Sequence, residues 1–78
     1  MSGDYSEQIR QIGLRIAYFR KLKRLTQADL ATILNINKTY LSQIECGLGN
    51  KSVSLPLLIR ISEKLDIPLA KLVDIEKA

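Results

Sequence analysis

The sequence predicts an all-α protein that folds as one small domain of five short helices. Apolar residues recur at helical spacing in successive stretches, and residues that cap or break helices separate those stretches. No stretch has the convincing pattern of a strand. A chain of 78 residues is close to the size at which a single hydrophobic core becomes marginal. We therefore expect one domain over residues 1–78, with its core between about 6 and 76.

The first helix is expected from about Ser6 to Arg24. Its apolar side chains follow the spacing of a buried helical stripe: Ile9, Ile12, Ile16 and Phe19. Asp4 or Ser6 can cap its amino end. Gly13 lies inside this helix, where glycine lowers stability relative to alanine. We expect Gly13 to mark close packing against another backbone.

Two shorter helices follow in the stretch TQADLATILNINKTYLSQIECG. Thr26 is expected to cap the second helix, and Asp29 favours its positive end. Asn35 ends this helix, because asparagine enters the left-handed backbone region readily. Asn37 caps the third helix and Gly47 closes it, with Gly49 shortly after. The side chains expected to be buried are Leu30, Ala31, Leu34, Leu41 and Ile44.

A loop, LGNKSV, leads to the two last helices. Ser54 is expected to cap a fourth helix that runs to about Leu65, with Pro56 tolerated in its first turn. Its apolar stripe is Leu55, Leu58, Ile61 and Leu65. The stretch DIP breaks the chain again, and LAKLVDIEKA is expected to form a short final helix.

Several classes of protein are excluded by composition. The chain has no histidine and one cysteine, Cys46, so an internal disulfide is impossible and a zinc site is implausible. No imidazole is present to activate a nucleophile, and we expect no enzyme activity, catalytic residue, metal or cofactor. The longest apolar run, LPLLI, is too short to span a bilayer, and MSGDYSEQ lacks a signal-peptide pattern. A cytoplasmic protein without a membrane partner or an evident small-molecule effector is expected.

The positive charge is unevenly distributed along the chain. Residues 10–51 carry eight Lys or Arg and two Asp or Glu, whereas residues 52–78 carry four of each sign. This distribution favours an anionic partner that contacts the first two-thirds of the chain. On charge alone, a solvated charged surface without a partner is an equally good interpretation.

The third helix has one apolar side and one polar, largely uncharged side. At about 100° per residue, Lys38, Thr39, Ser42 and Gln43 fall within an arc of roughly 140°, with the buried residues opposite. Two helices joined by a tight turn, the second exposing polar side chains, describe a helix-turn-helix. An ordinary amphipathic surface helix is the alternative, but it would more often carry Glu and Lys on its outer side.

The same stretch resembles the helix-turn-helix of the phage-repressor-like family, of the Cro/repressor or XRE type. Gln27 opens the second helix as in that family, and residues 9–75 follow its pattern. The family's apolar positions are occupied by Leu30, Ala31, Leu34, Ile36, Leu41 and Ile44. Asn35 replaces the usual glycine, Cys46 replaces a commonly polar residue, and LGNKSV is a residue or two longer than in many members. The resemblance implies a compact lambda-repressor-like fold of five helices.

The resemblance also implies which side chains contact DNA. Lys38, Thr39 and Gln43 match the positions that reach base edges in the major groove, with Ser42 and Tyr40 at the margins. Their chemistry agrees, because Gln can pair with adenine, Lys can donate to guanine, and the Thr methyl can contact thymine. Packing at the edge of the helix is the alternative for Tyr40.

Other positions match family residues that contact phosphate or hold the fold together. Gln27 matches the residue that grips phosphate and braces the next helix, and Asn50 and Lys51 match a region of backbone contact. The alternative for Asn50 and Lys51 is that they are simply turn residues. Arg20 and Glu45 match a buried ion pair between the first and third helices, in which a guanidinium can hold a carboxylate bidentately.

The sequence therefore predicts a sequence-specific regulator of transcription that binds double-stranded DNA. One helix reads only a few base pairs, so we expect a homodimer on a palindromic operator, with half-sites about one helical turn apart. Candidate dimer contacts are Leu69, Leu72, Val73 and Ile75, which could instead seal the core. The short chain and the stretch NKTYLSQIE also resemble the small controller proteins of restriction–modification systems.

Two other interpretations remain. In the first, the same fold is an antitoxin-like module that mainly binds a protein partner. In the second, RIAYFRKLKRL acts as a basic amphipathic helix at a membrane surface, although its apolar residues are needed to cover the other helices.

Overall fold

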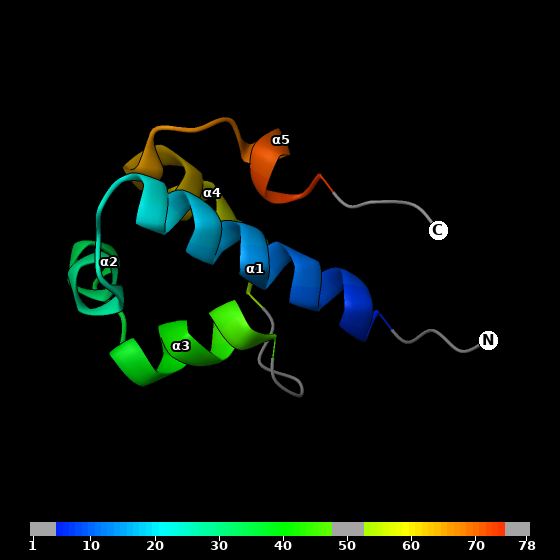
Figure 1. Ribbon diagram of the computed structural model, residues 1–78, viewed down its shortest axis with the longest axis horizontal. Coiled ribbons are helices and arrows are strands. Elements are labelled where there is room, and N and C mark those ends of the chain that lie inside the picture. The colour runs from blue at the N-terminus through cyan, green and yellow to red at the C-terminus, as the bar shows by residue number, and fades with distance from the viewer. Residues whose placement is uncertain (1–4, 48–52, 75–78) are drawn as a thin grey trace.

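The computed structural model describes residues 5–47 and 53–74, and it confirms the predicted all-α fold. Five helices lie in these ranges: α1 (Ser6–Leu22), α2 (Gln27–Leu34), α3 (Lys38–Cys46), α4 (Leu55–Leu65) and α5 (Leu69–Leu72). No strand occurs among the described residues. In Figure 1, α1 crosses the molecule, with α3 on one side and α4 and α5 on the other. The main packing partner of α1 is α3, and α2 packs against both α3 and α4.

Polar side chains cap the amino ends of α2, α3 and α4, as predicted. The Thr26 hydroxyl accepts from the Asp29 backbone N–H at 3.0 Å, and the Asp29 carboxylate accepts from the Thr26 backbone N–H at 2.9 Å. These bonds form a capping box, and they hold the pKa of Asp29 below its usual value. The Asn37 side chain accepts from two backbone N–H groups of α3, and Ser54 accepts from the N–H of Leu57.

The start of α1 differs from the expectation. Tyr5 occupies the cap position without a side-chain capping bond, and Ser6 is already the first helical residue. The prediction that Ser6 caps this helix is therefore wrong, while the alternative cap, Asp4, lies outside the described residues.

Three helices are followed, within two residues of their last helical residue, by a non-glycine residue in the left-handed region. These residues are Arg24, Asn35 and Asp66, with φ of 60°, 58° and 57°. In each case the next residue is apolar and its N–H bonds back to a carbonyl of the helix: Leu25 to Arg20, Ile36 to Ala31, and Ile67 to Ser62. This is the Schellman pattern of helix termination. Because Arg24 takes the left-handed conformation, α1 ends at Leu22, two residues before the predicted end.

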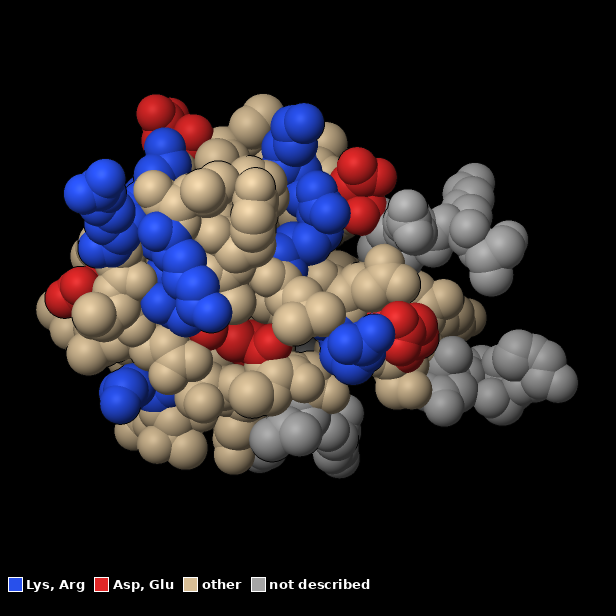
Figure 2. Space-filling view, viewed as in Figure 1, with Lys and Arg blue, Asp and Glu red and all other residues tan. Residues whose placement is uncertain are grey.

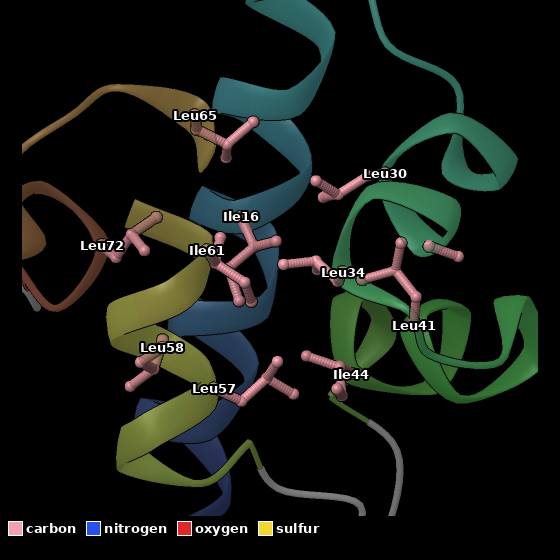
Figure 3. Close-up of a cluster of buried hydrophobic side chains, with 11 residues drawn as sticks. Ile16, Leu30, Leu34, Leu41, Ile44, Leu57, Leu58, Ile61, Leu65 and Leu72 are labelled. Carbon is pink, nitrogen blue, oxygen red and sulfur yellow. The ribbon is translucent and has the colours of Figure 1, made fainter. Parts of the chain in front are cut away.

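The core lies between α1, α2, α3, α4 and α5 (Figure 3). Its buried apolar residues are Ile16, Leu30, Ala31, Leu34, Leu41, Ile44, Leu57, Leu58, Ile61, Leu65 and Leu72. Ile12 and Phe19 of the predicted α1 stripe pack against this cluster while partly buried. One predicted core position is wrong: Leu55 is 61% exposed, and Leu57 is buried instead. On a helical wheel Leu57 lies close to Ile61, whereas Leu55 lies far from it.

The last described helix is shorter than predicted. It contains only Leu69–Leu72, with Val73 exposed after it, and residues 75–78 lie outside the described part. Leu72 is completely buried within the single chain. Leu72 is therefore removed from the candidate dimer contacts, which is a correction of the prediction. Leu69 and Val73 remain candidates, and Ile75 lies outside the described residues.

Two glycines allow α1 and the carboxyl end of α3 to touch through their backbones. A Cβ at Gly13 would overlap the carbonyl oxygen of Ile44 and lie 2.9 Å from that of Glu45. A Cβ at Gly47 would lie 2.6 Å from Cα of Arg10, and Gly47 has a φ of 64°. The predicted close backbone packing at Gly13 is thus confirmed, and the partner is the end of α3.

We expect Gly13→Ala to destabilise the fold even though alanine is the better helix former. The added methyl group has to push α3 away from α1, and such overpacking lowers the free energy of unfolding by about 1–3 kcal/mol. Urea denaturation followed by circular dichroism measures this loss. The reverse exchange on the same helix, Ala17→Gly, measures the effect of helix propensity. A Gly13→Ala protein as stable as the wild type would contradict the packing described here.

Candidate nucleic-acid interface

The predicted helix-turn-helix is present as α2, a tight turn and α3. The turn needs only Asn35, Ile36 and Asn37: the first takes the left-handed conformation, the second packs against the core, and the third caps α3. Leu41 and Ile44 anchor α3 from its inner side, where both are buried. The outer side of α3 is consequently held in one orientation and faces away from the core.

The structure places the predicted base-reading residues on the open part of α3. Lys38 and Thr39 are exposed, and Ser42 and Gln43 are half-buried. Tyr40 is partly buried and packs against the core, which is the alternative that the sequence left open for it. The remaining four side chains offer hydroxyl, amide and ammonium groups for hydrogen bonds at one surface.

A buried ion pair joins α1 to α3. Nε of Arg20 donates to one carboxylate oxygen of Glu45 at 2.7 Å, and Nη2 donates to the other at 2.9 Å. Both side chains are almost completely buried. Nη1 of Arg20 also donates to the carbonyl oxygen of Leu25 at 2.8 Å. The predicted bidentate pair is therefore present, and it also fastens the turn between α1 and α2.

Gln27 connects α2 to the same ion pair. Its Nε2 donates to Glu45 Oε1 at 2.9 Å, so the bracing of α3 that the resemblance implied is present. Gln27 remains partly exposed at the amino end of α2. Among the described residues, no buried side-chain nitrogen or oxygen lacks a hydrogen-bond partner. Each buried polar atom that positions α3 thus has at least one hydrogen-bond partner.

Sequence reasoning missed Arg60, and it considered Cys46 only as the one cysteine of the chain and as a departure from the family pattern. Arg60 of α4 donates through Nη2 to the carbonyl oxygen of Leu34 at 2.7 Å, where its charge complements the carboxyl end of α2. Cys46 is exposed at the end of α3. On the helical wheel it falls on the same side as Thr39 and Gln43, so the spacing alone could have placed it there.

Basic side chains gather over parts of the surface shown in Figure 2. Lys21, Lys23 and Arg24 are exposed at the carboxyl end of α1, just before α2 begins, and Lys38 is exposed at the start of α3. Arg10 differs from them because it donates two hydrogen bonds to the Glu7 carboxylate, at 3.1 and 2.8 Å. This contact lowers the pKa of Glu7.

Two candidate phosphate contacts, Asn50 and Lys51, lie outside the described residues. Within the described ranges, His, Cys, Asp and Glu side chains do not gather in a group that could hold a metal ion. None of the helices there is long and apolar enough to cross a membrane. The chemistry that the described surface offers is non-covalent recognition through hydrogen bonds and positive charge.

Comparisons with known proteins agree with this geometry. The family model described as helix-turn-helix matches residues 16–72. The crystal structure of the restriction–modification controller protein C.AhdI from Aeromonas hydrophila is similar, with a TM-score of 0.74 and 29% sequence identity. The match covers 87% of this chain and 98% of that one. The search of curated proteins found no match.

We expect the Arg20–Glu45 pair to dominate the stability of the helix arrangement. Glu45→Ala leaves the Arg20 guanidinium buried without its carboxylate, which should lower the free energy of unfolding by about 3–5 kcal/mol. The double variant Arg20→Leu/Glu45→Leu should recover much of this loss, because apolar side chains can fill the site. Chemical denaturation of the three proteins tests both statements.

The exposed pair provides the matched control. Glu7→Ala breaks the contact with Arg10 at the surface, and it should leave the free energy of unfolding nearly unchanged. If Glu45→Ala were as mild as Glu7→Ala, the ion pair would not be holding α3 in place.

Proposed function

Because this chain belongs to the helix-turn-helix family and is a DNA-binding transcriptional regulator, we propose that it reads a palindromic operator as a homodimer. In this proposal residues 1–78 act as one domain. α3 lies in the major groove of double-stranded DNA, and binding is sequence-specific. The observation that carries the proposal is the outer side of α3, which is polar and open while its inner side is anchored in the core.

Base reading falls to Lys38, Thr39 and Gln43, with Ser42 beside them. A major groove about 12 Å wide admits one α-helix, whose diameter with side chains is about 10–12 Å. The Gln43 amide can donate to and accept from one adenine, and Lys38 can donate to guanine. Since each good bidentate contact discriminates against the wrong base by about 1–3 kcal/mol, a few such side chains account for sequence preference. Tyr40 contributes at the margin, through its hydroxyl.

Phosphate contacts position the helix but carry no sequence information. The Gln27 amide nitrogen has two hydrogens and gives one to Glu45. The second is available to a phosphate oxygen, and the bond to Glu45 holds the amide in place for it. Asn50 and Lys51 belong to the same group of contacts. The exposed charges of Lys21, Lys23 and Arg24 add long-range attraction.

The proposed homodimer forms through apolar residues of α4 and the segment after it. Leu55 and Ile59 are exposed one turn apart on α4, and Val73 is exposed directly after α5. Leu69 is partly buried next to the core. α4 packs against α5, so these side chains come from neighbouring elements. One α3 alone reads too few bases to specify an operator. Dimerisation doubles the number of bases that are read.

We expect Gln43→Ala and Gln27→Ala to have different effects. Gln43→Ala should lose discrimination by about 1–3 kcal/mol at one base pair of each half-site, while its salt-sensitive non-specific binding persists. Gln27→Ala should weaken specific and non-specific complexes alike, because it removes a phosphate contact. Selection of bound duplexes from a random pool, followed by titrations at several salt concentrations, measures both effects.

The control for these variants is Gln8→Ala, which removes an exposed glutamine from the amino-terminal turns of α1. It should bind the selected duplexes like the wild type. The selected sequences should also be palindromic. Unchanged discrimination in Gln43→Ala would refute the assignment of the reading side.

The dimer contact has its own test. Ile59→Glu places a charge on the exposed apolar side of α4, and we expect it to shift sedimentation from dimer towards monomer. Operator affinity should then fall by at least tenfold, since both half-sites must be filled by separate chains. Ile33→Glu, at an exposed apolar position of α2, is the control for oligomeric state. A dimer that persists in Ile59→Glu would rule out this surface.

A further inference from the structure

α1 carries a second apolar stripe that the core does not use. Leu14, Tyr18 and Leu22 are 49%, 58% and 58% exposed. They follow one another at intervals of four residues, so they form one line along the outer side of the helix. Figure 2 shows uncharged side chains over the middle of α1, between groups of Lys and Arg. Large exposed apolar side chains that form a continuous row mark an interaction surface more often than single scattered apolar side chains do.

This stripe is directed away from the reading helix. At about 100° per residue, it covers roughly 80° of the α1 surface. Gly13 and Arg20, the residues through which α1 touches α3, lie about 140–160° from its centre. DNA that covers the outer side of α3 would therefore leave the stripe open. A partner on the stripe and DNA on α3 can be bound at the same time.

The amino-terminal half of the stripe contains a hollow, and two of the side chains that line it, Arg15 and Tyr18, already contact neighbouring groups. An open hollow of about 430 Å³ is lined by Leu14, Arg15 and Tyr18. Nε of Arg15 donates to the carbonyl oxygen of Lys71, and its guanidinium lies 5.9 Å from the centre of the Phe19 ring. The Tyr18 ring packs edge-on against Phe19 at 5.0 Å. Side chains that are ordered in advance lower the entropy cost of binding.

The charge around the stripe selects the kind of partner. Arg15 and Lys21 flank it, and Lys23 and Arg24 follow its carboxyl end. The acidic residue at the amino end, Glu7, already accepts hydrogen bonds from Arg10 and from Gln11. A second copy of this chain would bring the same positive charges and be repelled. A carboxylate-bearing partner would be attracted, and the terminal amino groups of Arg15 can donate to it while Nε stays bound to Lys71.

We propose that the outer side of α1 docks an acidic amphipathic helix of another protein. One large apolar side chain of that helix enters the hollow between Leu14 and Tyr18, and its next apolar residues lie along the stripe to Leu22. Its carboxylates pair with Arg15 and Lys21. The contact is small, so the complex is transient. The regulator can in this way hold a second protein beside the DNA that it occupies.

The experiment selects peptides on the intact folded chain. The probe is a displayed library of helical peptides of about 16 residues, roughly 24 Å long, with varied apolar and charged positions. We expect the enriched peptides to carry an acidic side and an apolar side. Their affinity should fall about tenfold or more for Tyr18→Ala, which removes a wall of the hollow. Arg15→Gln should weaken them too, and more so at low salt. Circular dichroism verifies that each variant is folded.

Ile33→Ala is the matched control, because it truncates an exposed apolar side chain on α2, and it should leave peptide binding unchanged. The proposal is overturned if no peptide is enriched, if the enriched peptides are neutral or basic, or if they bind Tyr18→Ala as well as wild type. Binding to vesicles of mixed phosphatidylglycerol and phosphatidylcholine, lost in Tyr18→Ala while peptides fail, would assign the stripe to a lipid surface instead. Self-association that depends on Tyr18 would assign it to a second copy.

A duplex selected on the same protein separates this inference from the proposed function. The enriched peptide should bind the DNA-bound chain as well as the free chain at a salt concentration that screens the repulsion between the acidic peptide and the DNA. Competition between peptide and duplex would place the peptide on α3 and overturn the inference. Failure to select any duplex would count against the operator proposal, and the peptide measurements on the free chain would still decide the role of α1.

Discussion

The position of α3 depends on one buried carboxylate. Glu45 receives two hydrogen bonds from Arg20 on α1 and one from Gln27 on α2. Arg20 in turn binds the carbonyl oxygen of Leu25, in the turn that joins those two helices. A charge buried in this way is tolerated only when its partners are all in place. The network therefore admits one arrangement of the three helices, and that arrangement decides which side of α3 faces outwards.

Close backbone contact complements this network. Gly13 and Gly47 let the carboxyl end of α3 lie directly on α1, next to the ion pair. The apolar anchors Leu41 and Ile44 hold the inner side of α3 against the core. Polar and apolar contacts thus act on the same short helix from the same side. On its outer side Lys38 and Thr39 are exposed and Ser42 and Gln43 are half-buried, so hydroxyl, amide and ammonium groups lie at that surface.

α1 presents two different surfaces on opposite sides. Its inner side supplies Ile16 to the core and Arg20 to the ion pair. Its outer side carries the apolar stripe between Leu14 and Leu22, flanked by basic residues. Because the helix is fixed so firmly on its inner side, the outer side is a rigid surface. A rigid surface suits docking, since little conformational entropy is lost when a partner binds.

Local chemistry let the sequence alone determine much of this protein. Thr26, Asn37 and Ser54 cap helices through contacts within four residues, and Asn35 turns the chain by its own backbone preference, so their neighbours in sequence were sufficient. The Arg20–Glu45 pair followed from a family resemblance. Only the tertiary structure decided that Leu57 is buried and Leu55 exposed, that Leu72 belongs to the core, and that Leu14 and Tyr18 face outwards. An apolar residue is compatible with either side of a helix, and the helices packed around it determine which side is covered.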